Sequence, residues 1–498
     1  MRGPAPPGAG RERSSEVHRA ARRLGEAGVR RLVVVGGGVS GLAAAHRASE
    51  LARERGAAVE TTLVEARPRL GGTIATEHVD GFLVETGPDS FLSEKPWALA
   101  LCRRLHLEDR LVRTDDRFRR IFVLFGGRLH PLPEGFQLLA PTRLGPFLRS
   151  RLLSWRGKLR MALDLVLPRG GGGDESLGDF VRRRLGREAL ERIAQPLVAG
   201  IYTADPDTLS LAATMPRFLE LEQRERSVTL ALWRAARRAG GEAAGTSGAR
   251  WSLFVTFRDG MDELVRALGD RLPSGSVRLK ERVSGLEQAG RGWRVGLADG
   301  GGIDTDAVVI ASEPHEAARL LRHVDPAVAR LLGQIPCASS ATVTLGYRRS
   351  DIPRPLDAFG FVVPRIERRP ILACTFSSVK YPGRAPAGYA LLRVFLGGAL
   401  DAGVLEGADE SLAVLARAEL QHALGVTAPP VLTRVGRHPS AMPQYLVGHL
   451  SRVDAIDRML TAHPGLALAG GAYRGVGIAD CVRSGEQAVE RVLLDPRP

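Results

Sequence analysis

The sequence predicts an α/β fold whose core is a parallel sheet built from separated stretches of the chain. Near the N-terminus, the apolar run 32–35 breaks into three glycines and restarts as an alanine-rich helix from about Ser40. A second apolar run follows over 59–64, and near the C-terminus the run 466–469 again opens into glycines before an amphipathic helix. Short β-branched runs alternating with helices are typical of parallel strands that are buried on both faces.

The first glycine turn has the spacing of a dinucleotide-binding loop. Gly36, Gly38 and Gly41 form G-x-G-x-x-G between a predicted strand and a predicted helix. The first glycine permits the tight turn, the second lets a pyrophosphate approach the backbone, and the third lets helix and strand pack closely. The next strand ends on Glu65, where an acid normally holds a ribose hydroxyl. These features predict a Rossmann-like dinucleotide site rather than a merely structural turn.

The residues after Glu65 indicate which dinucleotide is bound. The segment 66–73, ARPRLGGT, adds a second glycine pair that a nicotinamide enzyme does not need and a long, buried FAD can use. The segment 85–90, ETGPDS, follows another strand, and 470–480, GGAYRGVGIAD, precedes the last helix, whose N-terminal amides attract anions. Both ends of the chain are therefore predicted to bind one FAD. The predicted FAD-binding residues are Gly36, Gly38, Val39, Ser40, Gly41, Glu65, Ala66, Arg69, Gly71, Gly72, Thr73, Gly87, Pro88, Asp89, Ser90, Gly470, Gly477 and Ile478.

Together these stretches form a longer pattern: GGGVSGLAAA, EARPRLGGT, ETGPDSF and GGAYRGVGIADCVRSGEQA, with the internal segments 195–210 and 374–386. The pattern resembles the oxygen-dependent porphyrinogen oxidases of haem biosynthesis, a group of monoamine-oxidase-like flavoproteins. The glycine motifs are shared by many FAD enzymes, whereas the two internal segments are more particular to porphyrinogen oxidases. The resemblance extends from about Arg31 to the C-terminus, and it implies that Val283 lies against the adenine end of the FAD.

The resemblance implies that the flavin carries out the chemistry. A porphyrinogen would lose hydrogen to FAD, dioxygen would reoxidise the flavin to give hydrogen peroxide, and three cycles would remove six electrons. No Ser–His–Asp arrangement or metal-ligand spacing is legible, so we assign no catalytic residue and no metal. A flat macrocycle with propionates needs an apolar slot with cations at its rim. Lys95 is the first candidate for a propionate partner, followed by Arg119, Arg120 and Arg384.

The substrate is open between two porphyrinogens. Protoporphyrinogen IX carries two propionates, and coproporphyrinogen III carries four and needs more cations and a more open slot. A membrane-like helical stretch favours protoporphyrinogen IX, which is our first choice, whereas GPDSFLSEKP and the N-terminal arm favour bacterial members, some of which use the tetracarboxylate. More remote alternatives are a flavin amine oxidase or desaturase and a flavin-binding protein without turnover.

Composition narrows the class of protein. The chain has 498 residues, is 44% hydrophobic and carries a net charge of +15, so it can hold two or three domains. A basic excess fits nucleic acid, anionic lipid or an acidic substrate, but the sequence shows no nucleic-acid-binding module, and a GC-rich genome explains the arginines equally well. The four cysteines form no C-x-x-C pair, which fits a reducing, cytoplasmic compartment. Cys481 is predicted to be a structural thiol rather than a covalent flavin link.

The chain divides into four predicted parts. Residues 1–30 form a disordered arm, and the FAD-binding domain combines 31–100, 251–315 and 451–498, with a strand beginning near Trp251, another at 277–283, a hairpin at 293–306 and a strand at 307–311. His315 is predicted to cap a helix. Residues 316–450, with strands near 341–347, 359–364, 371–376 and 390–396, form a mixed-sheet substrate domain. Residues 101–250 form a helical domain with glycine-rich breaks at 170–173 and 240–248.

The helical domain contains an unusual stretch over 136–165. Apolar residues, Trp155 among them, alternate with cations, and Asp164 is the only acid. This pattern fits a helix pair in a lipid headgroup plane, peripheral on the inner face of the cell membrane; the alternative is ordinary helices that pack on their own domain. No run of about 18 apolar residues appears, so no span is predicted. A homodimer is an open alternative. The cations are Arg143, Arg149, Arg151, Arg156, Lys158 and Arg160.

Overall fold

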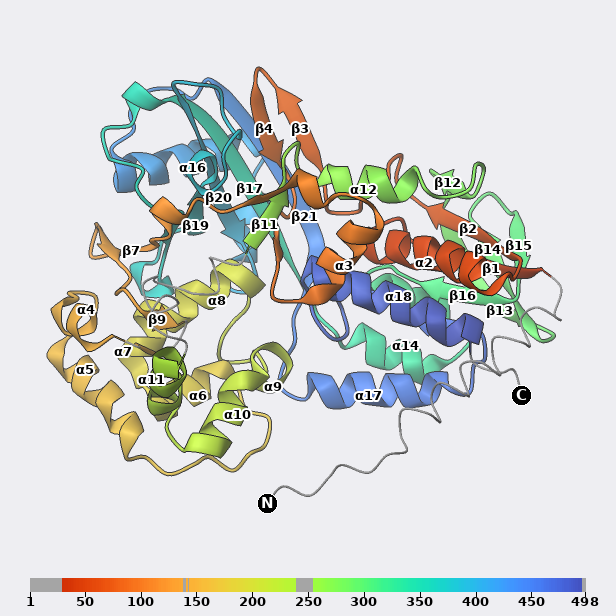
Figure 1. The fold of residues 1–498 in the computed structure, drawn as a ribbon, viewed down its shortest axis with the longest axis horizontal. Coiled ribbons are helices and arrows are strands. Elements are labelled where there is room, and N and C mark those ends of the chain that lie inside the picture. The colour runs from red at the N-terminus through yellow and green to blue at the C-terminus, as the bar shows by residue number, and fades with distance from the viewer. Residues whose placement is uncertain (1–28, 138–139, 142, 239–253, 495–498) are drawn as a thin grey trace. The chain divides into compact units, whose positions relative to one another are not determined.

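The structure is a computed structural model that describes residues 29–137, 140–141, 143–238 and 254–494. Most of the predicted arm, the break at 240–248 and Trp251 lie outside the described residues. The chain forms two compact units, which we describe separately (Figure 1). Within the described residues, unit 1 comprises 29–72, 264–334 and 453–494, and unit 2 comprises the intervening segments 73–263 and 335–452.

Unit 1 is built on a five-stranded parallel sheet with the strand order β12-β2-β1-β16-β22. All four neighbouring pairs are parallel, and the central strands β1 and β16 are almost fully buried apolar segments. The predicted strands at 32–35, 59–64, 307–311 and 466–469 are therefore confirmed. Their bounds are β1 Arg30–Val35, β2 Val59–Glu65, β12 Val277–Leu279, β16 Ala307–Ile310 and β22 Leu466–Leu468.

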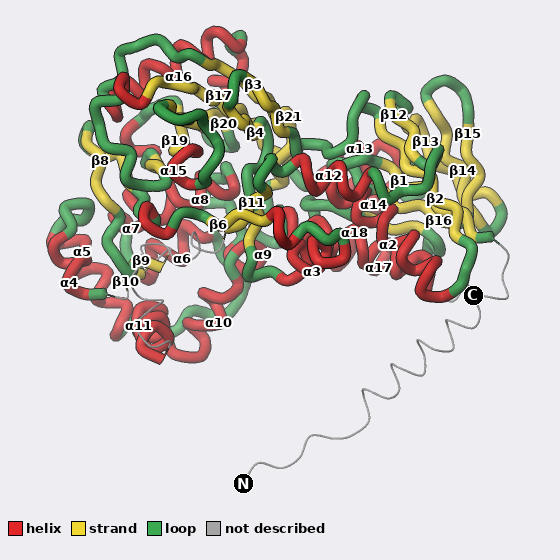
Figure 2. Tube along the Cα trace, turned by 45° about the horizontal axis from the view of Figure 1, so that its top comes forward, coloured by secondary structure: helices red, strands yellow, loops and turns green. Residues whose placement is uncertain are grey.

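Two long helices from opposite ends of the chain, α2 (Val39–Arg55) and α18 (Ile478–Leu494), lie side by side in unit 1 (Figures 1 and 2). Their close approach requires glycine, because a Cβ atom at Gly485 would lie 2.1 Å from the carbonyl oxygen of Ser40. Each helix follows a parallel strand, β1 or β22, so both helices begin at the carboxyl edge of the sheet. This edge is where open α/β sheets bind ligands.

Two details of unit 1 differ from the sequence prediction. The expected strand at 277–283 is two strands, because Lys280, with φ of 59°, turns the chain between β12 and β13. His315 does not cap a helix: α13 begins at Pro314 with Glu313 as its N-cap residue, so His315 lies in the first turn. The predicted hairpin is confirmed and belongs to a three-stranded antiparallel sheet. The remaining elements here are β13 Val283–Ala289, β14 Gly292–Leu297, β15 Gly302–Thr305, α13 Pro314–Leu321 and α14 Pro326–Gly333.

Unit 2 contains a seven-stranded mixed sheet with the strand order β21-β17-β20-β19-β18-β7-β8. Only the β18–β7 pair is parallel, and the helix α16 (Asp409–Leu424) packs its buried leucines against the sheet. The mixed sheet and its four predicted strands are confirmed. Two further strands, β7 and β8, come from the segment expected to be helical. The bounds are β7 Phe122–Phe125, β8 Arg128–Pro131, β17 Cys337–Arg348, β18 Gly360–Val362, β19 Ile371–Phe376, β20 Tyr389–Gly397 and β21 Leu432–Pro443.

The helices of unit 2 between residues 144 and 238 form a group around a buried ion pair (Figure 1). Arg184 and Asp164 are both fully buried, 2.6 Å apart, and Ser227 donates a hydrogen bond to the same carboxylate. A buried pair is tolerable when its remaining hydrogen bonds are satisfied, as here. The helices are α4 Leu144–Arg149, α5 Trp155–Ala162, α6 Leu177–Arg184, α7 Arg187–Ala189, α8 Gln195–Tyr202, α9 Leu211–Thr214, α10 Pro216–Glu225 and α11 Val228–Arg238.

Short elements complete the loop region of unit 2. The hairpin β3–β4 (Thr76–Val79 and Phe82–Glu85) carries Glu85 at its end. Three short strands form a small sheet, in the order β5-β11-β6. Their bounds are β5 Phe91–Leu92, β11 Phe254–Phe257 and β6 Leu111–Arg113, and the small helices nearby are α3 Pro96–Arg104 and α15 Ser377–Lys380.

Candidate cofactor and substrate sites

The glycine turn between β1 and α2 shows why each predicted glycine is needed. A Cβ atom at Gly41 would lie 1.9 Å from the carbonyl oxygen of Gly36, and Gly36 itself has φ of 106°. A Cβ atom at Gly38, in contrast, would meet nothing within 4 Å. Gly36 and Gly41 therefore serve the close packing of the turn, whereas Gly38 borders open space at the N-terminus of α2. Open space beside helix N–H groups suits a pyrophosphate.

Glu65 is held rigidly beside this turn. Its Oε2 atom accepts a hydrogen bond from the N–H of Gly37 at 2.6 Å, and its Oε1 atom accepts one from the N–H of Arg67 at 2.7 Å. The second glycine pair, Gly71 and Gly72, lies against the first glycine turn, because the N–H of Gly71 donates a hydrogen bond to the carbonyl oxygen of Gly37 at 2.8 Å. We call residues 36–41 and 65–72 together the glycine cradle. The structure thus brings these two predicted motifs together.

The C-terminal glycine turn lies at the same edge of the unit 1 sheet. Gly470 donates its N–H to the hydroxyl of Ser484 at 3.0 Å, and Ile478 begins α18. Gly475 has φ of 146°, and a Cβ atom there would clash with Asp480. Cys481 is half-buried on the first turn of α18, with its Sγ atom 3.9 Å from the carbonyl oxygen of Val476. This turn therefore offers backbone amides in the same unit as the glycine cradle.

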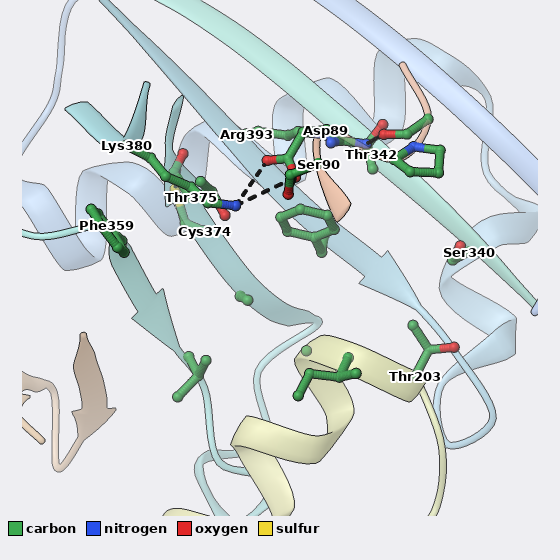
Figure 3. A pocket seen from close by; sticks show the side chains of 18 of the residues that line it. Asp89, Ser90, Thr203, Ser340, Thr342, Phe359, Cys374, Thr375, Lys380 and Arg393 are labelled. Carbon is green, nitrogen blue, oxygen red and sulfur yellow. Dashed lines mark hydrogen bonds and ion pairs between the residues drawn. The ribbon is translucent and has the colours of Figure 1, made fainter. Parts of the chain in front are cut away.

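Unit 2 contains a cavity of about 350 Å³ with a largely apolar lining (Figure 3). It is bordered by the predicted FAD-binding residues Thr73 and Gly87–Ser90, by the strands β17 to β20 and by α8. A Cβ atom at Gly87 would lie 1.7 Å from the carbonyl oxygen of Thr73, so this turn tolerates only glycine. The apolar wall includes Ile121, Ile201, Phe254, Phe359, Phe361, Val362, Phe395 and Met442.

Two buried cations and a half-buried carboxylate interrupt this apolar lining. The ammonium group of Lys380 lies 3.1 Å from Oδ2 and 3.4 Å from Oδ1 of Asp89, as Figure 3 shows. Burial raises the pKa of Asp89, but the charges of Lys380 and Arg393 outweigh burial and lower the pKa to about 2. Arg393 is 4% exposed and donates from Nη2 to the carbonyl oxygens of Gly87, at 2.5 Å, and Thr86, at 3.3 Å. Burial lowers the pKa of Arg393.

Residues 39–493 match the family described as flavin containing amine oxidoreductase. The chain belongs to this family. Among curated amine oxidoreductases of this type, coproporphyrinogen III oxidase of Bacillus subtilis is 35% identical over 94% of this chain and 98% of its own length. Protoporphyrinogen oxidase of Bos taurus is 33% identical over 93% of this chain and 98% of its own length. A crystal structure from Exiguobacterium sp. 255-15 with a provisional protoporphyrinogen oxidase name has a TM-score of 0.82, at 31% identity, and covers 94% of this chain and 99% of that one.

Membership of the amine oxidoreductase family confirms the predicted flavoprotein fold, and the cofactor is FAD. The glycine cradle fits FAD on this chain's own geometry, because Gly38 leaves room for a pyrophosphate and Glu65, the predicted ribose partner, is held in place beside it. Val283 opens β13, and its carbonyl oxygen accepts a hydrogen bond from Arg319 at 2.7 Å, which leaves the predicted adenine contact to its other atoms. The individual FAD-binding residues stay predictions.

The four cations predicted to bind propionates do not line the unit 2 cavity. Lys95 is the N-cap residue of α3, Arg119 pairs with Asp116, and Arg120 lies 3.4 Å from Asp357. Arg384 is buried and donates hydrogen bonds to the hydroxyl of Thr256 and the carbonyl oxygen of Phe257, at 2.9 and 2.8 Å. Their roles in substrate binding stay predictions, and Arg384 has an evident structural one.

Sequence reasoning missed the cations that do line the cavity, Lys380 and Arg393. Arg393 carried a legible signal, because it is the single charge inside the apolar run 390–396 that forms β20. A charge in such a run is either paired or functional, since isolated buried charges are costly. Lys380 lies within the segment 374–386 that supported the family resemblance, and only the fold places it beside Asp89.

A second candidate site is the exposed apolar surface formed by residues 144–166, hereafter the apolar surface. Seven large apolar side chains there are 45% to 68% exposed, out of thirteen such side chains in the described part of the chain. Two of the cations in this stretch serve the fold instead: Lys158 is buried and donates to the carbonyl oxygens of Leu148 and Ser150, both at 2.7 Å, and Arg160 donates to carbonyl oxygens of α6. The seven are Leu144, Leu148, Trp155, Leu159, Leu163, Leu165 and Val166.

The predicted helix pair begins later than the stretch that suggested it. Residues 136–137 and 140–141 form the short strands β9 (Phe136–Gln137) and β10 (Ala140–Pro141), while Leu138 and Leu139 lie outside the described residues. The helices α4 and α5 then carry four of the seven side chains of the apolar surface, and Leu163, Leu165 and Val166 lie in and just after the 3-10 turn that follows α5 (Figure 1). Over the parts of the chain that the structure describes, no helix combines the length and apolar character that crossing a membrane requires.

Proposed function

We propose that this chain is an oxygen-dependent porphyrinogen oxidase. It converts one porphyrinogen and three dioxygen molecules into one porphyrin and three hydrogen peroxide molecules, so that six electrons and six hydrogens leave the macrocycle. The observation that carries this proposal is the unit 2 cavity, which combines an apolar wall with buried cations next to the turn 87–90. A flat, apolar macrocycle with carboxylate arms needs both features. The names of the curated relatives support the same substrate class.

When bound, FAD supplies the hydride acceptor. The chain's own residues bind and orient the macrocycle and exclude water: the phenylalanines of the cavity wall present apolar faces, and Asp89, Lys380 and Arg393 hold one another in place. We assign no side chain as a general base, because the flavin accepts the hydride. Arg119 and Arg120 directly precede Ile121, a lining residue, and remain candidates for the carboxylate arms together with Lys95.

Anaerobic mixing of the yellow holoprotein with a reduced porphyrinogen tests this proposal. We expect the flavin absorbance to bleach, and air to restore it with one hydrogen peroxide for each two electrons removed. Cyclohexylamine is the control substrate, because an amine oxidase of the same fold would be bleached by the amine. Bleaching by the amine, without bleaching by either porphyrinogen, would contradict the assignment.

We also propose that the apolar surface rests on the inner face of the cytoplasmic membrane. Trp155 and Leu159 are 66% and 68% exposed, and Arg149, Arg151 and Arg156 are exposed beside them. Apolar side chains edged by cations fit the headgroup region of an anionic bilayer. Sedimentation with vesicles that contain anionic lipid, compared with neutral vesicles, tests this contact. The three-domain division and a homodimer stay predictions.

A further inference from the structure

The three charges in the unit 2 cavity do not balance. Lys380 and Arg393 are cations, and Asp89 is the one carboxylate that their charges hold at a low pKa. The next charged groups along the same loop region, Glu85 and Arg384, are of opposite sign and interact with each other. Counting only the three charged groups that line the cavity leaves one positive charge. A buried excess charge is costly unless a ligand compensates it.

Arg393 is the cation without a carboxylate of its own. Asp89 contacts Lys380 directly, whereas no carboxylate of the described residues lies within ion-pair distance of Arg393. The guanidinium instead donates to two backbone carbonyl oxygens and lies 4.9 Å from the ring centre of Phe395. Its Nε–H group is buried and has no hydrogen-bond partner anywhere in the described parts of the chain. A planar guanidinium with an unused donor is suited to bind a carboxylate.

The lining of the same cavity contains one further unpaired polar group. The hydroxyl of Thr203 is also buried without a partner among the described residues. Thr203 has a positive φ of 48°, which is unusual outside glycine, and its side chain faces the cavity in Figure 3. Backbone strain and unpaired polar atoms gather where a ligand completes the site. Both groups therefore indicate that an anionic, hydrogen-bonding ligand atom enters this cavity.

We propose that Arg393, supported by Lys380, is a specificity-determining subsite for a substrate carboxylate that coproporphyrinogen III carries and protoporphyrinogen IX lacks. This inference depends on the proposed porphyrinogen oxidase function. Protoporphyrinogen IX has vinyl groups where coproporphyrinogen III has its two further propionates. A vinyl group would leave the Arg393 charge uncompensated, and a propionate would compensate it. A site built to hydrogen-bond a ligand group discriminates strongly against the analogue that lacks it.

The test compares the two porphyrinogens in matched variants. Arg393→Gln removes the charge and retains a donor for the backbone carbonyl oxygens, Arg393→Lys retains the charge, and Arg128→Gln removes an exposed cation of β8 outside the cavity. We expect Arg393→Gln to lower the ratio of kcat/KM for coproporphyrinogen III to that for protoporphyrinogen IX by about tenfold or more. Arg393→Lys should recover much of this ratio, and Arg128→Gln should leave it unchanged.

A binding measurement provides a readout that does not depend on turnover. We expect Arg393→Gln to weaken the binding of coproporphyrin III, followed by porphyrin fluorescence, and to leave the binding of its tetramethyl ester unaffected. If Arg393→Gln does not retain FAD, Lys380→Gln removes the second cation and should shift both readouts in the same direction by a smaller factor.

Three outcomes would overturn the inference. Equal loss of activity on both porphyrinogens would make Arg393 a structural residue, and unchanged activity on both would exclude it from substrate binding. A shift in the FAD reduction potential with an unchanged ratio would mean that the charge serves the cofactor. These failures are distinct from a failure of the proposed function, in which the wild-type protein would oxidise neither porphyrinogen.

Discussion

The glycine cradle of unit 1 and the cavity of unit 2 are made in different ways. The cradle is made mainly of backbone: its glycines let carbonyl and amide groups approach one another, and its one acidic side chain, Glu65, is fixed by two backbone N–H groups. The cavity depends instead on side chains, because Asp89, Lys380 and Arg393 interact through their charges. A site built from backbone depends on free space and tolerates no added atom. A site built from charged side chains depends on the balance of charge, so it responds to pH and to compensating substitutions.

The largest effect should follow substitution of Gly41. In Gly41→Val the added Cβ atom would lie 1.9 Å from the backbone oxygen of Gly36, so the turn cannot form without a shift of main-chain atoms. We expect a loss of stability above about 4 kcal/mol and purification of protein without FAD. Thermal unfolding and the flavin absorbance per protein measure both effects.

Gly38→Ala is the matched control, because its Cβ atom meets nothing within 4 Å of the protein. It should fold with a nearly unchanged Tm and lose only FAD affinity. Equal destabilisation by both substitutions would contradict the distinct roles assigned to these two glycines.

The next largest effect concerns the charge balance of the cavity. Lys380→Met leaves Asp89 buried without its contact cation, and we expect a loss of about 3 to 5 kcal/mol in the free energy of unfolding. Asp89→Asn combined with Lys380→Met should recover most of this loss, because it removes the unpaired charge. A double-mutant cycle in urea checks this. Strict additivity of the two single substitutions would contradict the coupling.

The glycine cradle could be predicted from the sequence, whereas the charged cavity could not. The cradle was legible because Gly36, Gly38 and Gly41 lie within six residues and their steric roles are local; Glu65 follows at the end of the next strand. The cavity was not legible, because Lys380 and Asp89 are 291 residues apart and Arg393 and Gly87 are 306 apart. Arg119 and Arg120 were predicted as rim cations from the resemblance to porphyrinogen oxidases, yet only their neighbour Ile121 lines the cavity. The direction of a side chain at a strand end decides whether it lines the cavity, and the local sequence does not determine that direction.

A smaller effect is expected in the pH dependence of stability, which differs between two carboxyl groups of unit 2. Burial raises the pKa of Glu85 from 4.5 to about 7, in opposition to its hydrogen bonds from Thr76 and Met261, whereas the pKa of Asp89 is lowered. A raised pKa in the folded state means that stability is fully present below pH 4.5 and is lost as the pH rises through 7. We expect Glu85 to cost about 3 kcal/mol of stability between pH 5 and 8.

Urea unfolding at pH 5 and pH 8 checks this for Glu85→Gln, whose amide oxygen can still accept from the N–H of Met261 while its NH2 group donates to the hydroxyl oxygen of Thr76. The variant should gain stability over the wild type at pH 8 and match it at pH 5. Asp89→Asn is the opposite case: the stability that Asp89 contributes is present above pH 3.8 and is lost as the pH falls through 2. A pH-independent difference for Glu85→Gln would contradict the assigned pKa.

The smallest effect on stability belongs to the apolar surface. Trp155→Ser and Leu159→Ser change side chains that are 66% and 68% exposed, so the free energy of unfolding should change by less than about 0.5 kcal/mol each. Because these side chains would be buried only in lipid, the pair should weaken binding to anionic vesicles by about tenfold or more. Leu412→Ser, in the buried face of α16, is the inverse control: it should lower the Tm by several degrees without a specific effect on vesicles. If Trp155→Ser and Leu159→Ser destabilised the fold as Leu412→Ser does, the apolar surface would be part of the core and not a docking site. Comparing these substitutions distinguishes an apolar surface that binds a partner from an apolar face that packs in the core. Neither exposure nor composition makes this distinction alone.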